Sequence, residues 1–173
     1  MSGVLDWLSS LAQTYPELRL DLLGRLVLAS ILGGAIGWER EQAHKPAGLR
    51  TNILICMGAT LLTDLSVKVA AQATGSGDPG RIAAQIVTGV GFLGAGTILQ
   101  SRGSIVGLTT AATLWVVAAI GMAVGFGATI EAVGATFLVL VALIPLRALE
   151  QDAKARQTRK NLQATVVGED PES

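Results

Sequence analysis

The sequence is poor in the residues from which most enzyme sites are built. It holds one histidine, His44, and one cysteine, Cys56, which rules out an intramolecular disulfide and a histidine-built metal site. Only 15% of the residues are charged and 4% are aromatic, whereas soluble domains carry roughly 25% charged residues. The formal net charge is zero, so no basic surplus points to a nucleic-acid partner.

Hydrophobic residues make up half of the 173 positions, and 21 are glycine. Small residues let helices approach closely in lipid, so this composition favours a packed bundle of membrane helices. Residues 1–21 lack the basic start of a signal peptide and are interrupted by Asp6, Glu17 and Asp21. We expect an amphipathic segment there, which either lies in the membrane interface or packs on the bundle.

Five apolar runs approach the roughly 17–25 residues that a helix needs to cross a bilayer. Turn-forming residues separate them. The predicted fold class is therefore all-α, a polytopic membrane protein with a five-helix domain over residues 22–146 and a short cytoplasmic tail over 147–173. The expected spans are residues 22–38, 49–69, 82–99, 108–124 and 128–144.

The distribution of lysine and arginine predicts the orientation. With five spans, the loops after the first and third helices share one side with the C-terminal tail. That side has nine basic residues and the other has four, namely Arg19, Arg25, Lys68 and Arg81. We therefore expect the C-terminus in the cytoplasm and the N-terminus outside.

Ionisable side chains in or near the spans are the candidate functional residues, because charge in hydrocarbon must pair, face a cavity or reach an interface. Asp64 and Lys68 are four residues apart on the second predicted helix and are expected to pair. For Asp64, deep in this span, a polar cavity and a structural role stay open as alternatives. Glu131 lies about one turn into the last helix, within reach of the outer interface, and reads as structural.

Glycines recur at four-residue spacing, which is typical of close helix packing. Gly33 and Gly37 have this spacing, as do Gly121 and Gly125. The third helix is denser in glycine than packing alone requires, so we expect either very close helix contact or a local break. Its glycines are Gly89, Gly91, Gly94 and Gly96.

Several motifs resemble the MgtC/SapB family, in order and over roughly residues 22–144. They are Gly37-Trp-Glu-Arg-Glu41, Gly48-Leu-Arg-Thr51, Asp78-Pro-Gly-Arg-Ile-Ala-Ala-Gln85, Gly91-Phe-Leu-Gly-Ala-Gly-Thr-Ile98 and Gly107-Leu-Thr-Thr-Ala-Ala-Thr-Leu-Trp115.

The resemblance implies a bacterial inner-membrane protein linked to magnesium limitation and, in pathogens, to survival inside macrophages. Virulence members look like regulators that act on the rotary ATP synthase rather than carriers of magnesium. They have a C-terminal domain of ACT-like fold, where we expect only the short tail here. Matched to the family motifs, the expected functional positions are Glu39, Arg50, Asp78, Arg81, Gln85 and Thr109, to which the charge argument adds Asp64.

Three functions remain in competition. The leading hypothesis is a regulatory or binding protein in the lipid bilayer, a homo-oligomer with a dimer favoured, and the ATP synthase or another membrane protein as partner. The alternative is an ion path, for instance for magnesium, formed by an oligomer. The third is a structural subunit of a larger complex. The sequence has no phosphate-binding loop and no catalytic triad grouping, so we expect no enzyme and no cofactor other than, under the transport hypothesis, magnesium.

Overall fold

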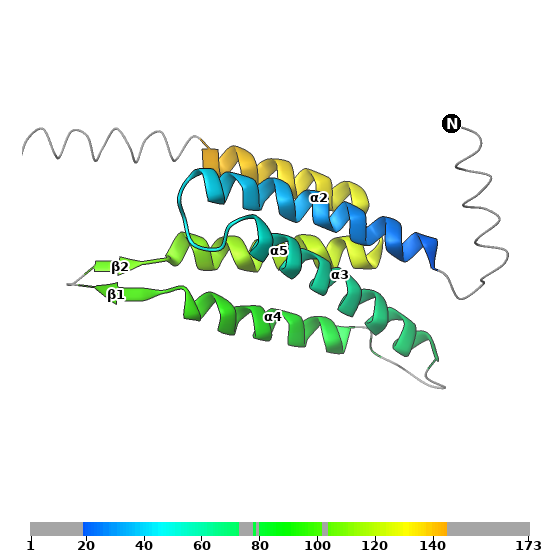
Figure 1. Cartoon of the computed structure of the whole chain (residues 1–173). Coiled ribbons are helices and arrows are strands. Elements are labelled where there is room, and N and C mark those ends of the chain that lie inside the picture. Colours follow the sequence, from blue (N-terminus) through cyan, green and yellow to red (C-terminus); the bar gives the residue numbers. More distant parts are fainter. Residues whose placement is uncertain (1–18, 73–77, 79, 102–103, 145–173) are drawn as a thin grey trace, which may run out of the picture.

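A computed structural model describes residues 19–72, 78, 80–101 and 104–144. This part of the chain contains five helices and one small antiparallel hairpin (Figure 1). The helices are α2 (Leu20–Gln42), α3 (Leu49–Gln72), α4 (Gly80–Gly96), α5 (Leu108–Phe126) and a last helix, Thr129–Ile144. The strands are β1 (Leu99–Ser101) and β2 (Ser104–Val106), in which Leu99 pairs with Val106.

The predicted all-α membrane fold is confirmed, with a helix at each of the five expected places. Three helices, α2, α3 and α5, are long and apolar enough to cross a membrane. The last helix and α4 are shorter, at 16 and 17 residues, close to the lower limit of about 17 for a spanning helix. The protein is therefore a membrane protein, and large apolar side chains point outward from all five helices.

The arrangement is centred on α3, which makes its most extensive contacts with α2 and α5. Glycines on both neighbours meet its backbone. A Cβ atom added at Gly121 of α5 would lie 2.3 Å from the carbonyl oxygen of Cys56. One added at Gly33, Gly37 or Gly125 would come within 2.6–2.7 Å of an α3 atom. A Cβ atom at any of these four positions would require the helices to shift, so the glycine spacing seen in the sequence does mark close packing.

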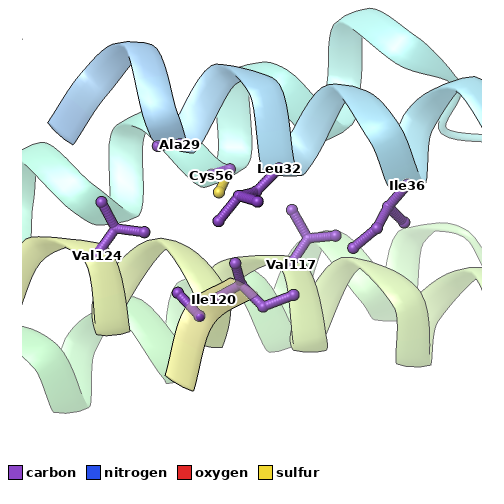
Figure 2. Packing of buried hydrophobic residues seen from close by; sticks show 8 residues of the cluster. Ala29, Leu32, Ile36, Cys56, Val117, Ile120 and Val124 are labelled. Carbon is purple, nitrogen blue, oxygen red and sulfur yellow. The ribbon is translucent and has the colours of Figure 1, made fainter. Parts of the chain in front are cut away.

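Apolar side chains fill the space between these helices (Figure 2). Ile36 of α2 and Val117 and Val124 of α5 are fully buried. They surround Cys56 of α3, which is also fully buried and acts as a small apolar side chain. A second cluster attaches α4 to α3 and α5 through Ile86 and Val90.

The third helix differs from its prediction in length and shape. Instead of continuing to Leu99, α4 ends at Gly96, and Leu99 lies in β1. The expected alternative of a break in the glycine run is wrong, because α4 is one continuous helix. Close contact is found only at Gly94, where an added Cβ would lie 3.4 Å from Ala111. Gly89, Gly91 and Gly96 face open space.

The hairpin replaces the loop that was expected between the third and fourth helices. Gly107 turns the chain from β2 into α5 with φ +98°, and a Cβ there would lie 1.9 Å from the Thr97 carbonyl oxygen. Only glycine fits this turn. The predicted amphipathic segment 1–21 lies outside the described residues except for its end, where Leu20 and Asp21 already belong to α2. The predicted tail 147–173 lies outside them entirely.

Gly121→Ala should destabilise the bundle, because its new methyl group collides with the α3 backbone. Overpacking of this kind costs about 1–3 kcal/mol. The matched control is Gly134→Ala, where the methyl group meets open space and alanine is the better helix former by about 1 kcal/mol. In detergent, thermal unfolding should therefore begin at a lower temperature for Gly121→Ala and at an equal or higher temperature for Gly134→Ala. Equal melting of the two variants would contradict the packing described here.

Candidate functional site

The seven predicted site residues do not form one site, because the structure divides them between the two ends of the bundle (Figure 1). The 23 residues of α2 make it about 34 Å long. At the end where α2 stops and α3 and α5 begin lie Glu39, Arg50 and Thr109. Toward the opposite end, where α2 and α4 begin, lie Asp64, Asp78, Arg81 and Gln85.

Asp64 is buried and paired, but with Arg19 rather than with the predicted Lys68. Both guanidinium Nη atoms of Arg19 donate to its carboxylate, one to Oδ2 and the other to Oδ1 at 2.9 Å. The hydrogen bonds and the negative charge of Asp64 raise the pKa of the Arg19 guanidinium above its usual value. The bidentate pair ties the residue before α2 to α3. It gives Asp64 a structural contact, while a role of Asp64 in a polar cavity stays a prediction.

Two further hydrogen bonds join polar side chains of the core to backbone carbonyl oxygens of α5. Arg25 of α2 donates from Nη1 to the carbonyl oxygen of Gly125 at 2.8 Å, which satisfies a free carbonyl near the end of α5. In the middle of the bundle, the Thr60 hydroxyl lies 2.8 Å from the carbonyl oxygen of Gly121. Thr63 is the exception in this region, because its buried hydroxyl makes no hydrogen bond within the described structure.

A buried charged pair occupies the other end of α2. Arg40 is 3% exposed, and its Nη1 lies 3.8 Å from Oε2 of Glu39. Its Nη2 donates to the Thr110 hydroxyl at 3.4 Å, which connects α2 to the first turn of α5. Oε2 of Glu39 has no hydrogen bond from any residue the structure describes. The neighbouring Thr109, which was the predicted residue, has an exposed side chain.

Arg50 lies nearby but on the surface, in an open hollow of about 510 Å³ over the turn between α2 and α3. His44 and Lys45 line the same hollow. Asn52 holds this turn in place, because its side-chain amide donates to the carbonyl oxygens of Ala47 at 2.6 Å and Gly48 at 2.9 Å. Arg50 is therefore placed to meet water or headgroups rather than Glu39.

Three predicted residues do come together in an open cavity of about 560 Å³ between the end of α3 and the start of α4. Asp78, Arg81 and Gln85 line it, together with Ser66 of α3. Oδ1 of Asp78 accepts a hydrogen bond from the Gly80 amide at 2.7 Å, so this carboxylate caps α4. Arg81 and Gln85 make no ion pair or side-chain hydrogen bond with the described residues. This cavity is the candidate binding site that best matches the sequence prediction.

The charges of the bundle favour binding of polar groups over coordination of a metal by this chain alone. In the described residues no three His, Cys, Asp or Glu side chains are grouped closely enough to hold an ion. Asp64 is occupied by Arg19, and Asp78 shares its cavity with the positive charge of Arg81. A hard divalent cation prefers several oxygen ligands, which neither place supplies.

The sequence indicated the buried acidic residues Asp64 and Glu39 but not the arginines that lie beside them, Arg19 and Arg40. Arg19 was counted only among the basic residues of the outer side, and Arg40, although it belongs to the Gly37–Glu41 motif, was not among the expected functional positions. A signal for Arg40 was present, because it is one helical turn from Ile36 and Gly37 and so shares their buried face. For Arg19 no local signal exists, since its partner is 45 residues away.

Comparison with known proteins agrees with this architecture. Residues 26–152 match the MgtC family, which is well over half of the chain. The chain belongs to the MgtC family. No solved structure matches it.

Relatives in three bacteria share the membrane core. The chain is 53% identical to the protein named "Putative magnesium transporter YhiD" of Escherichia coli K12, over 62% of this chain and 52% of that protein. It is 45% identical to Protein MgtC of Salmonella typhimurium LT2, over 73% and 52%. A Haemophilus influenzae protein is 41% identical, over 83% and 64%. The matched region thus spans only about half to two thirds of the length of these relatives.

The Arg19–Asp64 pair can be tested by a double-mutant cycle. Arg19→Leu alone should lower the thermal stability in detergent more than Arg19→Leu combined with Asp64→Leu, because the single variant leaves a buried carboxylate without its partner. Arg50→Leu serves as the control and should leave stability unchanged, because Arg50 is exposed and makes no ion pair with the described residues. If the single and double variants melt together, the pair does not hold α2 against α3.

Proposed function

We propose that this protein takes part in magnesium homeostasis of the bacterial inner membrane and acts by binding another membrane component, not by carrying magnesium through its own helices. The Escherichia coli relative is named "Putative magnesium transporter YhiD", and the family match supports a shared role for the membrane core. The role is one of binding rather than catalysis.

The observation that carries the proposal is the closed core. Glycine contacts bring the backbones of α2, α3 and α5 together. The side chains of Arg19, Arg25 and Thr60 form hydrogen bonds with groups of the bundle itself. An ion path needs oxygen atoms that are free to replace water around the ion. The residues available for recognition lie instead on the surface, in the cavity of Arg81 and Gln85 and in the hollow of Arg50.

Transport is the second candidate, and one observation favours it: the cavity between α3 and α4 is open, and the polar side chains of Asp78, Arg81 and Gln85 line part of it. A path there would have to run between copies of the chain. Arg81 at its mouth would repel a divalent cation, which makes magnesium the least suitable cargo. The family resemblance offers the rotary ATP synthase as a partner for the binding role.

The two candidates predict opposite magnesium fluxes when the purified protein is reconstituted into liposomes. Under our proposal the full chain carries no magnesium flux above that of empty liposomes, while its expression in a deletion strain restores growth at low magnesium. Arg81→Ala should reduce this growth. The growth of Arg50→Ala, measured in the same way, shows whether the opposite end of the bundle also takes part. Magnesium flux that the wild type shows and Arg81→Ala changes would overturn the binding role. Failure of the wild type to affect growth at low magnesium would overturn the link to magnesium.

A further inference from the structure

The outward face of α4 is the surface that the packing of the chain leaves unexplained. Three of its exposed side chains are polar: Arg81, Gln85 and Thr88, spaced by four and three residues along one side of the helix. Polar groups of membrane helices normally face the interior of the bundle or water, because hydrocarbon offers them no partner. Here Arg81 and Gln85 face the open cavity at the edge of their own bundle and Thr88 is exposed beyond it, while α4 contacts the bundle through Ile86 and Val90.

Gln85 and Thr88 also lie within the part of α4 that crosses the membrane. Gln85 lies five residues into α4, about 8 Å along its axis, and α4 needs nearly all of its 17 residues to cross a bilayer. The carboxamide of Gln85 makes no hydrogen bond with the described residues. Thr88 bonds only to its own helix, at the carbonyl oxygen of Ala84. The open cavity leaves the Gln85 carboxamide free to bond to a helix of another chain, and such a bond stabilises a helix contact in the membrane.

Glycine usage points to a helix as the missing neighbour. On α2 and α5, Gly33, Gly37, Gly121 and Gly125 each lie against the backbone or Cβ of a facing helix. Gly91 has nothing within 4 Å and costs helix stability without an intrachain contact in return. Ala84 and Ala95 continue the same outward stripe of small residues. The stripe resembles the glycine faces that do pack in this protein, except that Phe92, which is four residues from Thr88 and 80% exposed, projects from the same side and would have to lie against the neighbour.

Charge at the end of the stripe indicates which helix would fit. Asp78 and Arg81 are both exposed at the mouth of α4, and neither has an ion-pair partner in the described chain. Two copies in one membrane share their orientation, so a two-fold axis along the membrane normal would set the two α4 helices side by side at equal depth. Arg81 of each copy then meets Asp78 of the other, and the two Gln85 side chains come together.

We propose that the outer face of α4, consisting of Arg81, Ala84, Gln85, Thr88, Gly91 and Ala95, is the interface with a second copy of this chain. The interface is held by reciprocal Arg81–Asp78 ion pairs and by hydrogen bonds between the Gln85 carboxamides. It places the cavity of Asp78, Arg81 and Gln85 beside the two-fold axis, so the candidate site of each copy is completed by the other. This deepens the proposed function, but its test does not depend on any magnesium phenotype.

Disulfide cross-linking in native membranes tests the face. Thr88→Cys, introduced into the full chain with the buried Cys56 left in place, should give a dimer of the chain on oxidation. Ile130→Cys is the matched control, because Ile130 is 85% exposed on the last helix, and it should stay monomeric. Equal cross-linking of the two variants overturns the proposal, as does a Thr88→Cys product with a protein of another size.

A large side chain in the stripe of small residues on α4 should separate the two copies without unfolding either one. Gly91→Leu in the Thr88→Cys background should weaken association about tenfold, a loss typical of a disrupted small-residue helix interface. Gly134→Leu, at an equally open glycine of the last helix, should leave cross-linking unchanged. A dimer yield that survives Gly91→Leu contradicts an interface at this face.

Charge exchange tests the ion pairs and controls for misfolding. In the Thr88→Cys background, Arg81→Asp alone and Asp78→Arg alone should each lower the dimer yield, because like charges then face one another. When the two variants are co-expressed with different tags, each copy meets an opposite charge at both positions, and the mixed dimer should recover. Loss of the mixed dimer, or full dimerisation of either variant alone, overturns the pairing.

Discussion

Close approach of the α3 backbone to α2 and α5 is the constraint on which the rest of the structure depends. Four glycines on the two neighbouring helices leave no room for a side chain between them and α3. In lipid the hydrophobic effect does not drive helices together, so packing and hydrogen bonds must do it, and both strengthen as backbones approach. The Thr60–Gly121 hydrogen bond and the Arg25–Gly125 contact exist only because the helices are this near.

The tight core has a consequence for function. Once Asp64 is paired with Arg19 and Thr60 bonds to nearby carbonyl oxygens, few polar groups, the hydroxyl of Thr63 among them, are left in the centre of the bundle to bind a solute. The groups left for recognition are moved to the two ends and to the outer face of α4. This arrangement supports the proposal that the protein acts through its surface, on a partner or on another copy, rather than as a pore. The ends are about a helix length apart and present different chemistry, with a buried Glu39–Arg40 pair at one and an open Arg81 cavity at the other.

Much of this fold could be predicted from the sequence because hydropathy and glycine spacing act locally. The five helices follow from apolar runs, and Gly33, Gly37, Gly121 and Gly125 were correctly identified as packing positions. The hairpin was missed because Leu99 and Val106 continue the apolar pattern of the helices on either side. Pairing was predicted poorly, since Arg19–Asp64 depends on how α2 lies along α3. The roles of Arg81 and Gln85 stay predictions, although the structure brings them together as the motif indicated.

The contact between α2 and α3 can be measured directly with the only cysteine of the chain. A Cβ at Gly33 would lie 2.7 Å from Cβ of Cys56, whereas one at Gly34 points toward Ile53. Disulfides need a Cβ separation of about 3.5–4.5 Å, which a small shift of α2 supplies. On oxidation in the membrane, Gly33→Cys should form an intramolecular disulfide with Cys56, and Gly34→Cys should not, as read by mass spectrometry of blocked thiols. Two free thiols in Gly33→Cys, or a disulfide in Gly34→Cys, would contradict the packing on which this account rests.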